Sequence, residues 1–235
     1  MSRPGQHRVR AVVFDAVGTL LWPEPAVGAA YTSAARRLGS TRDTVDVRAR
    51  FHAAWRAEEA RDCDSGGLRT DEARERRRWQ RIVAEVFPEV DRQNELFGAL
   101  WEHFAQAANW RLFDDVVDTW RELSEKGLAL AVASNFDRRL LEICASIAPL
   151  AACRHVYASS LVGWRKPALE FFQHVAAALN LPAESILMIG DDYENDVVAA
   201  RQAGWQAVYL SRERVADDEA AISSLREVLA VAGEV

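Results

Sequence analysis

The residues from Val9 to Leu20 constrain the fold more than any other stretch of the chain. A mostly apolar run with several β-branched residues ends at Asp15, and a turn containing Gly18 and Thr19 follows. Such a run is typical of a strand buried on both faces of a parallel sheet. Ligands of open α/β sheets bind outside the carboxyl ends of the strands, so we expect Asp15 at a binding crevice. Backbone N–H groups of such a turn can surround an anion, which makes Gly18 a candidate substrate-binding residue.

Composition excludes several other classes of protein. The 235 residues are 49% hydrophobic and 27% charged, as in ordinary globular proteins. A net charge of -6 argues against nucleic acid as a partner. The three cysteines are too few and too scattered for a disulfide framework or a C-x-x-C metal site. With no signal peptide and no apolar run of about 20 residues, we expect a cytoplasmic protein without a membrane partner. No oligomeric state is favoured.

Four helical patterns follow the first turn, with no strand between them. The segment Trp22-Pro23-Glu24-Pro25 reads as a rigid connector that ends the first unit. Apolar residues then recur at helical spacing over about 27–38, 44–61, 70–87 and 93–108. The apolar stripes predict amphipathic helices that face one another. We therefore predict an all-helical domain over residues 22–109.

From Trp110 onward, helices and strands alternate. The pattern predicts strands over 128–133, 155–158, 185–189 and 206–210, and helices over about 115–126, 138–147, 166–180, 194–203 and 218–230. This alternation implies right-handed βαβ units on a parallel sheet. The sequence thus predicts an α/β protein whose Rossmann-like core domain comprises residues 1–21 and 110–235, with the helical domain inserted after the first strand.

Polar residues stand at the predicted strand ends and in the loop after the third strand. They are Asp15, Ser134, Asn135, Lys166, Asp191, Asp192 and Asp196. If the sheet is parallel, all of them converge on one crevice. Carboxylates at two strand ends make a hard-oxygen site suited to Mg²⁺. A hydroxyl, a lysine and backbone amides nearby suit the remaining oxygens of a phosphoryl group.

Four stretches at these positions resemble the motifs of the haloacid dehalogenase-like hydrolase superfamily. The first is Phe14-Asp15-Ala16-Val17-Gly18-Thr19-Leu20, the second Val132-Ala133-Ser134-Asn135, and the third Gly163-Trp164-Arg165-Lys166-Pro167. The fourth is acidic and extends from Ile189-Gly190-Asp191-Asp192 through Asn195-Asp196 to Ala203-Gly204. The motifs occur in order from residue 12 to about 205. The helical insert after the first motif resembles the C1-type cap of this superfamily.

The resemblance implies a nucleophile and a metal site. Asp15 would attack phosphorus and form an aspartyl-phosphate. The backbone carbonyl of Val17 and the carboxylate of Asp191 would join Asp15 on Mg²⁺. Asp196 would lie behind these ligands or serve as an alternative metal ligand.

The resemblance also implies phosphate contacts. Ser134 and the Asn135 amide would hold phosphate oxygens. Lys166, one of only two lysines in the chain, would neutralise the nucleophile and the phosphate.

Val17 departs from the family pattern. Phosphatases of the family usually carry a second Asp at this position, which serves as general acid for the leaving group and then as base for water. A valine cannot transfer a proton, and this assistance is typically worth about 10²–10⁴-fold in rate. The closest resemblance is to haloacid dehalogenase-like domain-containing proteins with a non-acidic residue at this position.

Other branches of the superfamily fit less well. Phosphonatases use a cap lysine, and residues 22–109 contain none. Dehalogenases replace the metal Asp of the fourth motif by Ser or Asn, whereas this chain has Asp191. We therefore predict a Mg²⁺-dependent phosphohydrolase of a small phosphorylated metabolite with weakened proton transfer. A 2-haloacid dehalogenase and a non-enzymatic metal- and phosphate-binding protein are the alternatives. Trp22, Arg69 and Trp164 are guesses for groups that line the site.

Overall fold

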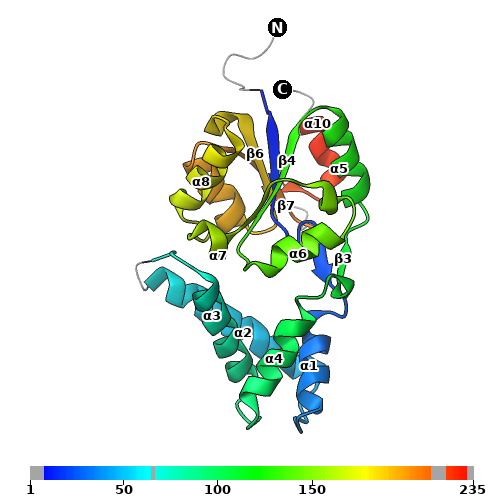
Figure 1. Ribbon diagram of the computed structural model, residues 1–235, viewed down its shortest axis with the longest axis vertical. Helices are drawn as coiled ribbons and strands as arrows, with labels where there is room; N and C mark the ends of the chain where they lie inside the picture. The colour runs from blue at the N-terminus through cyan, green and yellow to red at the C-terminus, as the bar shows by residue number, and fades with distance from the viewer. Residues whose placement is uncertain (1–7, 65–66, 213–220, 232–235) are drawn as a thin grey trace.

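A parallel sheet of six strands forms the centre of the molecule (Figure 1). The computed structural model describes residues 8–64, 67–212 and 221–231. The strands are β1 Ala11–Phe14, β4 Ala129–Ser134, β5 Val156–Ala158, β6 Ile186–Gly190, β7 Gln206–Leu210 and β8 Ala221–Ile222. Their order is β5-β4-β1-β6-β7-β8, and every adjacent pair is parallel. The predicted α/β fold is confirmed.

The strand β1 lies in the middle of the sheet because both of its faces are apolar. All four of its residues are buried. Successive side chains of a strand point to opposite faces. On one face, Val12 and Phe14 belong to an apolar cluster with three helices, α5 (Val116–Glu125), α6 (Arg139–Ser146) and α10 (Val228–Val231). On the other face, Val13 belongs to a second cluster with α8 (Leu169–Leu179) and α9 (Ala199–Gln202). Helices therefore cover both faces of the sheet.

Four helices form a separate layer beyond the carboxyl ends of the strands (Figure 1). They are α1 Val27–Arg36, α2 Thr44–Asp64, α3 Glu72–Val86 and α4 Gln93–His103. They pack around an apolar cluster of their own, which includes Tyr31, Ile82 and Leu96. The helical periodicity of the sequence predicted all four. Within the described ranges, every helix is too short or too polar to cross a bilayer.

The expected absence of strands from residues 22 to 109 is wrong at the first two residues. Leu21–Pro23 forms the strand β2, which pairs antiparallel with β3 (Trp110–Leu112) where the chain enters and leaves the helical layer. Half of the predicted connector is thus a strand. Strands of three residues are too short to show an alternating pattern, so they carry no periodic signal in the sequence.

Two further boundaries differ from the prediction. Lys166 and Pro167 precede α8, whose N-cap is Ala168, and a short helix α7 (Ser159–Val162) comes before them. The predicted helix over 218–230 is confirmed over 225–230 and wrong over 221–224. Ala221 and Ile222 extend the sheet as β8 beside Tyr209 and Leu210, and only 225–231 is helical. Residues 218–220 lie outside the described residues.

Candidate active site

Lys166 joins two carboxylates at the carboxyl end of the sheet. Its ammonium group donates to Oδ1 of Asp15 at 2.7 Å, to Oδ1 of Asp196 at 2.5 Å and to the Ala133 carbonyl at 3.1 Å. Lys166 is 2% exposed. Burial alone would lower the pKa of Lys166, but the charges of Asp15 and Asp196 outweigh burial and raise it. The lysine therefore stays positively charged beside Asp15.

Asp15, Asp191 and Asp196 form one acidic cluster. One carboxylate oxygen from each lies within 4.8 Å of the others. Asp191 is open to solvent on one side and accepts a hydrogen bond from the Thr19 hydroxyl at 2.8 Å. Burial of its remaining surface and the charge of Asp15 raise the pKa of Asp191 to about 6. Burial also raises the pKa of Asp196, against the opposing charge of Lys166.

Two glycines give this cluster its space. Gly18 has a φ of +92°, and a Cβ atom there would lie 2.1 Å from Oδ2 of Asp191. A Cβ atom on Gly190 would lie 2.0 Å from Oδ2 of Asp196. The Gly18 N–H already donates to the Leu21 carbonyl at 2.8 Å. Gly18 therefore makes room for Asp191, and its own N–H is not free for the anion contact that the sequence suggested.

Asn135 holds the loop that carries Lys166. Its side-chain amide donates to the Lys166 carbonyl at 2.9 Å, and its side-chain oxygen accepts from the Lys166 N–H at 2.8 Å. The side chain is therefore occupied, and among the described residues the backbone N–H of Asn135 donates to no other backbone group. Ser134, the last residue of β4, is 4% exposed and lines the same cavity.

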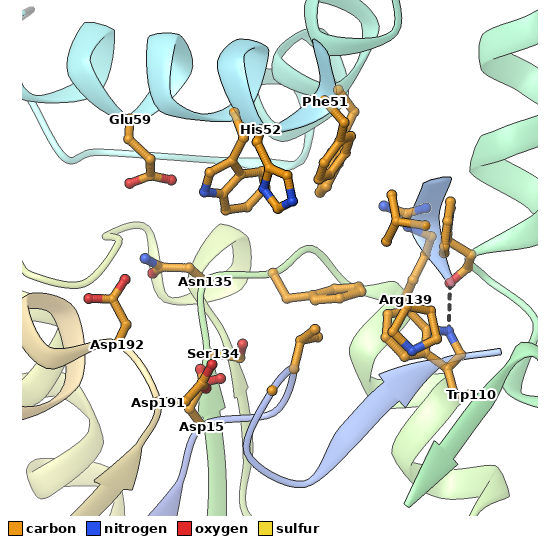
Figure 2. Close-up of a pocket in the computed structure, with 18 of the residues that line it drawn as sticks. Asp15, Phe51, His52, Glu59, Trp110, Ser134, Asn135, Arg139, Asp191 and Asp192 are labelled. Carbon is orange, nitrogen blue, oxygen red and sulfur yellow. Dashed lines mark hydrogen bonds between the residues drawn. The ribbon is translucent and has the colours of Figure 1, made fainter. Parts of the chain in front are cut away.

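A cavity of about 480 Å³ separates the acidic cluster from the helical layer. Figure 2 shows Asp15, Ser134 and Asp191 on one side of the cavity and Phe51, His52 and Glu59 of α2 on the other. All eight residues that the sequence predicted for the site line this cavity. They are Asp15, Val17, Gly18, Ser134, Asn135, Lys166, Asp191 and Asp196. The structure thus brings together every residue predicted for the site.

The three further residues guessed for the lining are wrong. Trp22, Arg69 and Trp164 are absent from the described lining. Arg69 instead stacks on Trp164 at 4.9 Å from the ring centre, in a short antiparallel bridge between the helical layer and the core.

The lining that sequence reasoning missed is aromatic. The residues are Tyr31, Phe51, Trp55, Trp79, Phe97, Trp101, Phe104, Trp110 and Phe136. Most of them belong to apolar stripes that predicted helix packing. These apolar stripes were the only sign of the aromatic lining in the sequence. Helical spacing shows that a helix face is apolar, but it does not show whether that face is packed against another helix or lines a cavity.

The family model for haloacid dehalogenase-like hydrolases matches residues 9–204, which covers most of the chain. The chain belongs to this family. Among curated proteins, the human haloacid dehalogenase-like hydrolase domain-containing protein 3 is 29% identical over 205 residues, which cover 84% of this chain and 81% of that protein.

Solved structures share the fold of this haloacid dehalogenase-like hydrolase. The defluorinating L-2-haloacid dehalogenase Rha0230 has a TM-score of 0.77 at 19% identity, and 99% of each chain is covered. A haloacid dehalogenase-like phosphatase from Thermococcus onnurineus has a TM-score of 0.66 at 21% identity, covering 96% of this chain and 99% of that one. Because dehalogenases and phosphatases both share the fold, the fold does not discriminate between the two reactions.

The site of this hydrolase suits a hard divalent cation. Three carboxylates and one ammonium group leave a formal charge of -2 when all are ionised. Within the described ranges, the Val17 carbonyl accepts no hydrogen bond from a backbone or side-chain donor. Carboxylate and carbonyl oxygens are the ligands that Mg²⁺ prefers, and the cluster contains neither sulfur nor nitrogen ligands.

Proposed function

We propose that this protein hydrolyses a small phosphate monoester through an aspartyl-phosphate on Asp15. Residues 22–109 would act as a cap over the core formed by 1–21 and 110–235. The observation that carries the proposal is the contact of Lys166 with both Asp15 and Asp196, beside Asp191 and beneath the cavity. A nucleophilic carboxylate, a fixed cation and a hard-metal site within one cluster are what phosphoryl transfer requires.

The first step uses the free oxygen of Asp15. Lys166 occupies Oδ1, and within the described residues Oδ2 accepts no hydrogen bond. Oδ2 attacks phosphorus while the bond to the ester oxygen breaks, and that oxygen leaves with the electron pair and takes a proton from water. Ser134 and the Asn135 backbone N–H hold phosphoryl oxygens. Bound to Asp15, the Val17 carbonyl and Asp191, with Asp196 nearby, Mg²⁺ would supply further positive charge at the phosphoryl group.

The second step regenerates Asp15. Water attacks the phosphorus of the aspartyl-phosphate, the bond from phosphorus to Oδ2 breaks, and inorganic phosphate and the carboxylate are released. One water proton goes to bulk solvent because Val17 offers no base. In the first step Val17 offers no acid to protonate the leaving group either. Substrates whose leaving group is a stable anion therefore react most readily with Asp15.

Loss of Asp15 tests the nucleophile. With an activated aryl phosphate and Mg²⁺, we expect phosphate release that disappears in Asp15→Asn and on addition of EDTA, because asparagine keeps the shape but loses the charge. Asp114→Asn, a change of an exposed residue outside the cavity lining, is the matched control and should retain activity. Release that survives both EDTA and Asp15→Asn would remove the assignment.

The same preparation separates the alternatives. Asp191 and Asp196 would hold a cation where a dehalogenase would carry none, so we expect no halide release from 2-chloropropionate. Halide release that requires Asp15 would favour dehalogenation. Tight Mg²⁺ and phosphate binding without turnover of any ester would favour a binding protein.

A further inference from the structure

We propose that the organic group of the substrate is bulky and apolar, a claim that rests on the phosphohydrolase function proposed above. The phosphoryl site occupies one end of the cavity, so the rest of the substrate must extend toward the helical layer. That layer presents aromatic rings to the cavity, among them Phe51, which Figure 2 labels. Trp55, Trp79 and Trp101 also line the cavity. Four of the eight tryptophans in the chain line this cavity.

The rings form a continuous wall. Trp55 and Trp79 lie 5.5 Å apart between ring centres, and Phe51 lies 6.3 Å from Trp55 and 6.5 Å from Trp79. These three side chains are only partly buried, although they belong to the apolar cluster of the helical layer. Burying apolar surface of this kind is favourable, and aromatic rings contribute most of the contact area in pockets that bind apolar groups.

The charged groups on this side of the cavity already have partners. The Arg139 guanidinium donates to both carboxylate oxygens of Asp137 and to the Trp101 carbonyl, and it stacks 3.5 Å from the centre of the Trp101 ring. Glu59 accepts hydrogen bonds from Arg78 and from Arg165, the latter at 3.2 Å. Both bonds to Glu59 end on Oε1, so Oε2 of Glu59 and the His52 ring are the polar groups left on this part of the lining. A sugar phosphate would therefore find few partners beyond these two for its several hydroxyl groups, and unpaired buried hydroxyl groups strongly disfavour binding.

Binding of n-alkylphosphonates, which carry a phosphoryl group that cannot be hydrolysed, tests the proposal without turnover. With Mg²⁺ present, calorimetric affinity should rise about threefold to fourfold for each methylene added from propyl to octyl. The non-hydrolysable phosphonate analogue of glucose 6-phosphate should bind more weakly than octylphosphonate. Affinity that does not change with chain length, or this polar phosphonate binding as tightly as octylphosphonate, would overturn the proposal.

Two tryptophan variants test whether the aromatic wall causes the dependence of affinity on chain length. Trp79→Gln replaces a ring of the wall with a polar side chain and should flatten the dependence of affinity on chain length, with little effect on propylphosphonate. Trp22→Gln is the matched control, because Trp22 is also partly exposed but lies outside the lining. Equal chain-length dependence in both variants would place the alkyl chain elsewhere and refute the proposed wall. The wild-type dependence stands without either variant, should one fail to fold.

Hydrolysis of the matching alkyl phosphates separates this inference from the function on which it rests. Affinity that rises with chain length without Asp15-dependent phosphate release would retain the apolar site and reject the phosphohydrolase. Phosphate release that favours small polar esters over octyl phosphate would retain the phosphohydrolase and reject the apolar substrate.

Discussion

Val17 occupies the position at which the proposed reaction lacks a general acid and base. Its side chain is 36% exposed and lines the cavity beside Asp15. The two half-reactions need a proton-transfer group to different degrees. Attack by Asp15 on an ester with an acidic leaving group needs no acid, whereas hydrolysis of the aspartyl-phosphate needs water to be deprotonated. The second step should therefore limit turnover of activated substrates.

Val17→Asp should raise turnover by about 10²-fold or more, because it restores general acid–base assistance. The exposed position leaves space for the carboxylate. The wild type should show an initial burst of the leaving group and, after acid quenching, a phosphate mass on the peptide that contains Asp15. If neither the burst nor the gain is seen, proton transfer comes from another group or the protein does not work as a phosphatase.

Gly190 tests how tightly the acidic cluster is packed. A methyl group there must displace Asp196, which holds Lys166 in place. We expect Gly190→Ala to lower the free energy of unfolding by about 1–3 kcal/mol and to reduce phosphate release. Gly98→Ala is the control, because a Cβ atom at this position in α4 meets no atom within 4 Å. It should stabilise the protein by about 0.5–1 kcal/mol in urea unfolding.

At the scale of elements, the sequence predicted what local patterns determine. The strands β1, β4, β6 and β7 have apolar runs, and the rule that parallel strands share one carboxyl edge brought Asp15, Ser134 and Asp191 together in advance. The strand β8 was missed because two residues carry no periodicity and its pairing with β7 is tertiary. The cavity was missed because helical spacing shows which residues avoid water, but not whether another side chain fills the space before them.

Asp115 is a second feature that no local pattern predicts. It accepts hydrogen bonds from Arg212 at 3.0 and 3.1 Å, from the Ser224 hydroxyl at 2.9 Å and from the Leu225 N–H at 2.9 Å. Arg212 also donates to the Thr19 carbonyl at 2.6 Å. Asp115 thus joins the start of α5 to the segment after β8, and its partner Arg212 extends the connection to the turn that follows Asp15.

This carboxylate should make stability depend on pH. Burial alone would raise the pKa of Asp115, but the hydrogen bonds from Arg212, Leu225 and Ser224 outweigh burial and lower it. A lowered folded-state pKa stabilises the protein above the unfolded-state value of about 3.9, and this contribution is lost as the pH falls through the folded-state pKa. Asp115→Asn should cost about 2–3 kcal/mol in urea unfolding at pH 7. Its difference from wild type should shrink below about pH 4. A constant difference across this range would contradict the assignment.

At the scale of the whole molecule, Arg165 connects the helical layer to the core. Its side chain is 1% exposed and donates to Glu75 at 2.7 Å and to Glu59 at 3.2 Å, both on helices of that layer. Its backbone N–H donates to the Leu68 carbonyl at 2.8 Å, and the Thr70 N–H donates to the Gly163 carbonyl at 3.0 Å. These contacts are made by Arg165 and Gly163, which lie close to Lys166 in the chain, so the packing of the helical layer and the position of the lysine are linked.

Removing this guanidinium should lower the free energy of unfolding and weaken the contacts between the helical layer and the core. Arg165→Met keeps much of the side-chain volume but leaves Glu59, Asp62 and Glu75 with one fewer buried cation. Breaking a buried ion pair from one side typically costs about 3–5 kcal/mol. We expect a loss of this size in urea unfolding, together with faster hydrogen exchange at the Thr70 amide. Arg121→Ala removes an exposed ion pair in α5 and should change stability by less than about 1 kcal/mol. If Arg165→Met behaves like this control, the contacts between the helical layer and the core do not depend on the buried charges, and the helical layer is held by its apolar contacts and backbone bridge instead.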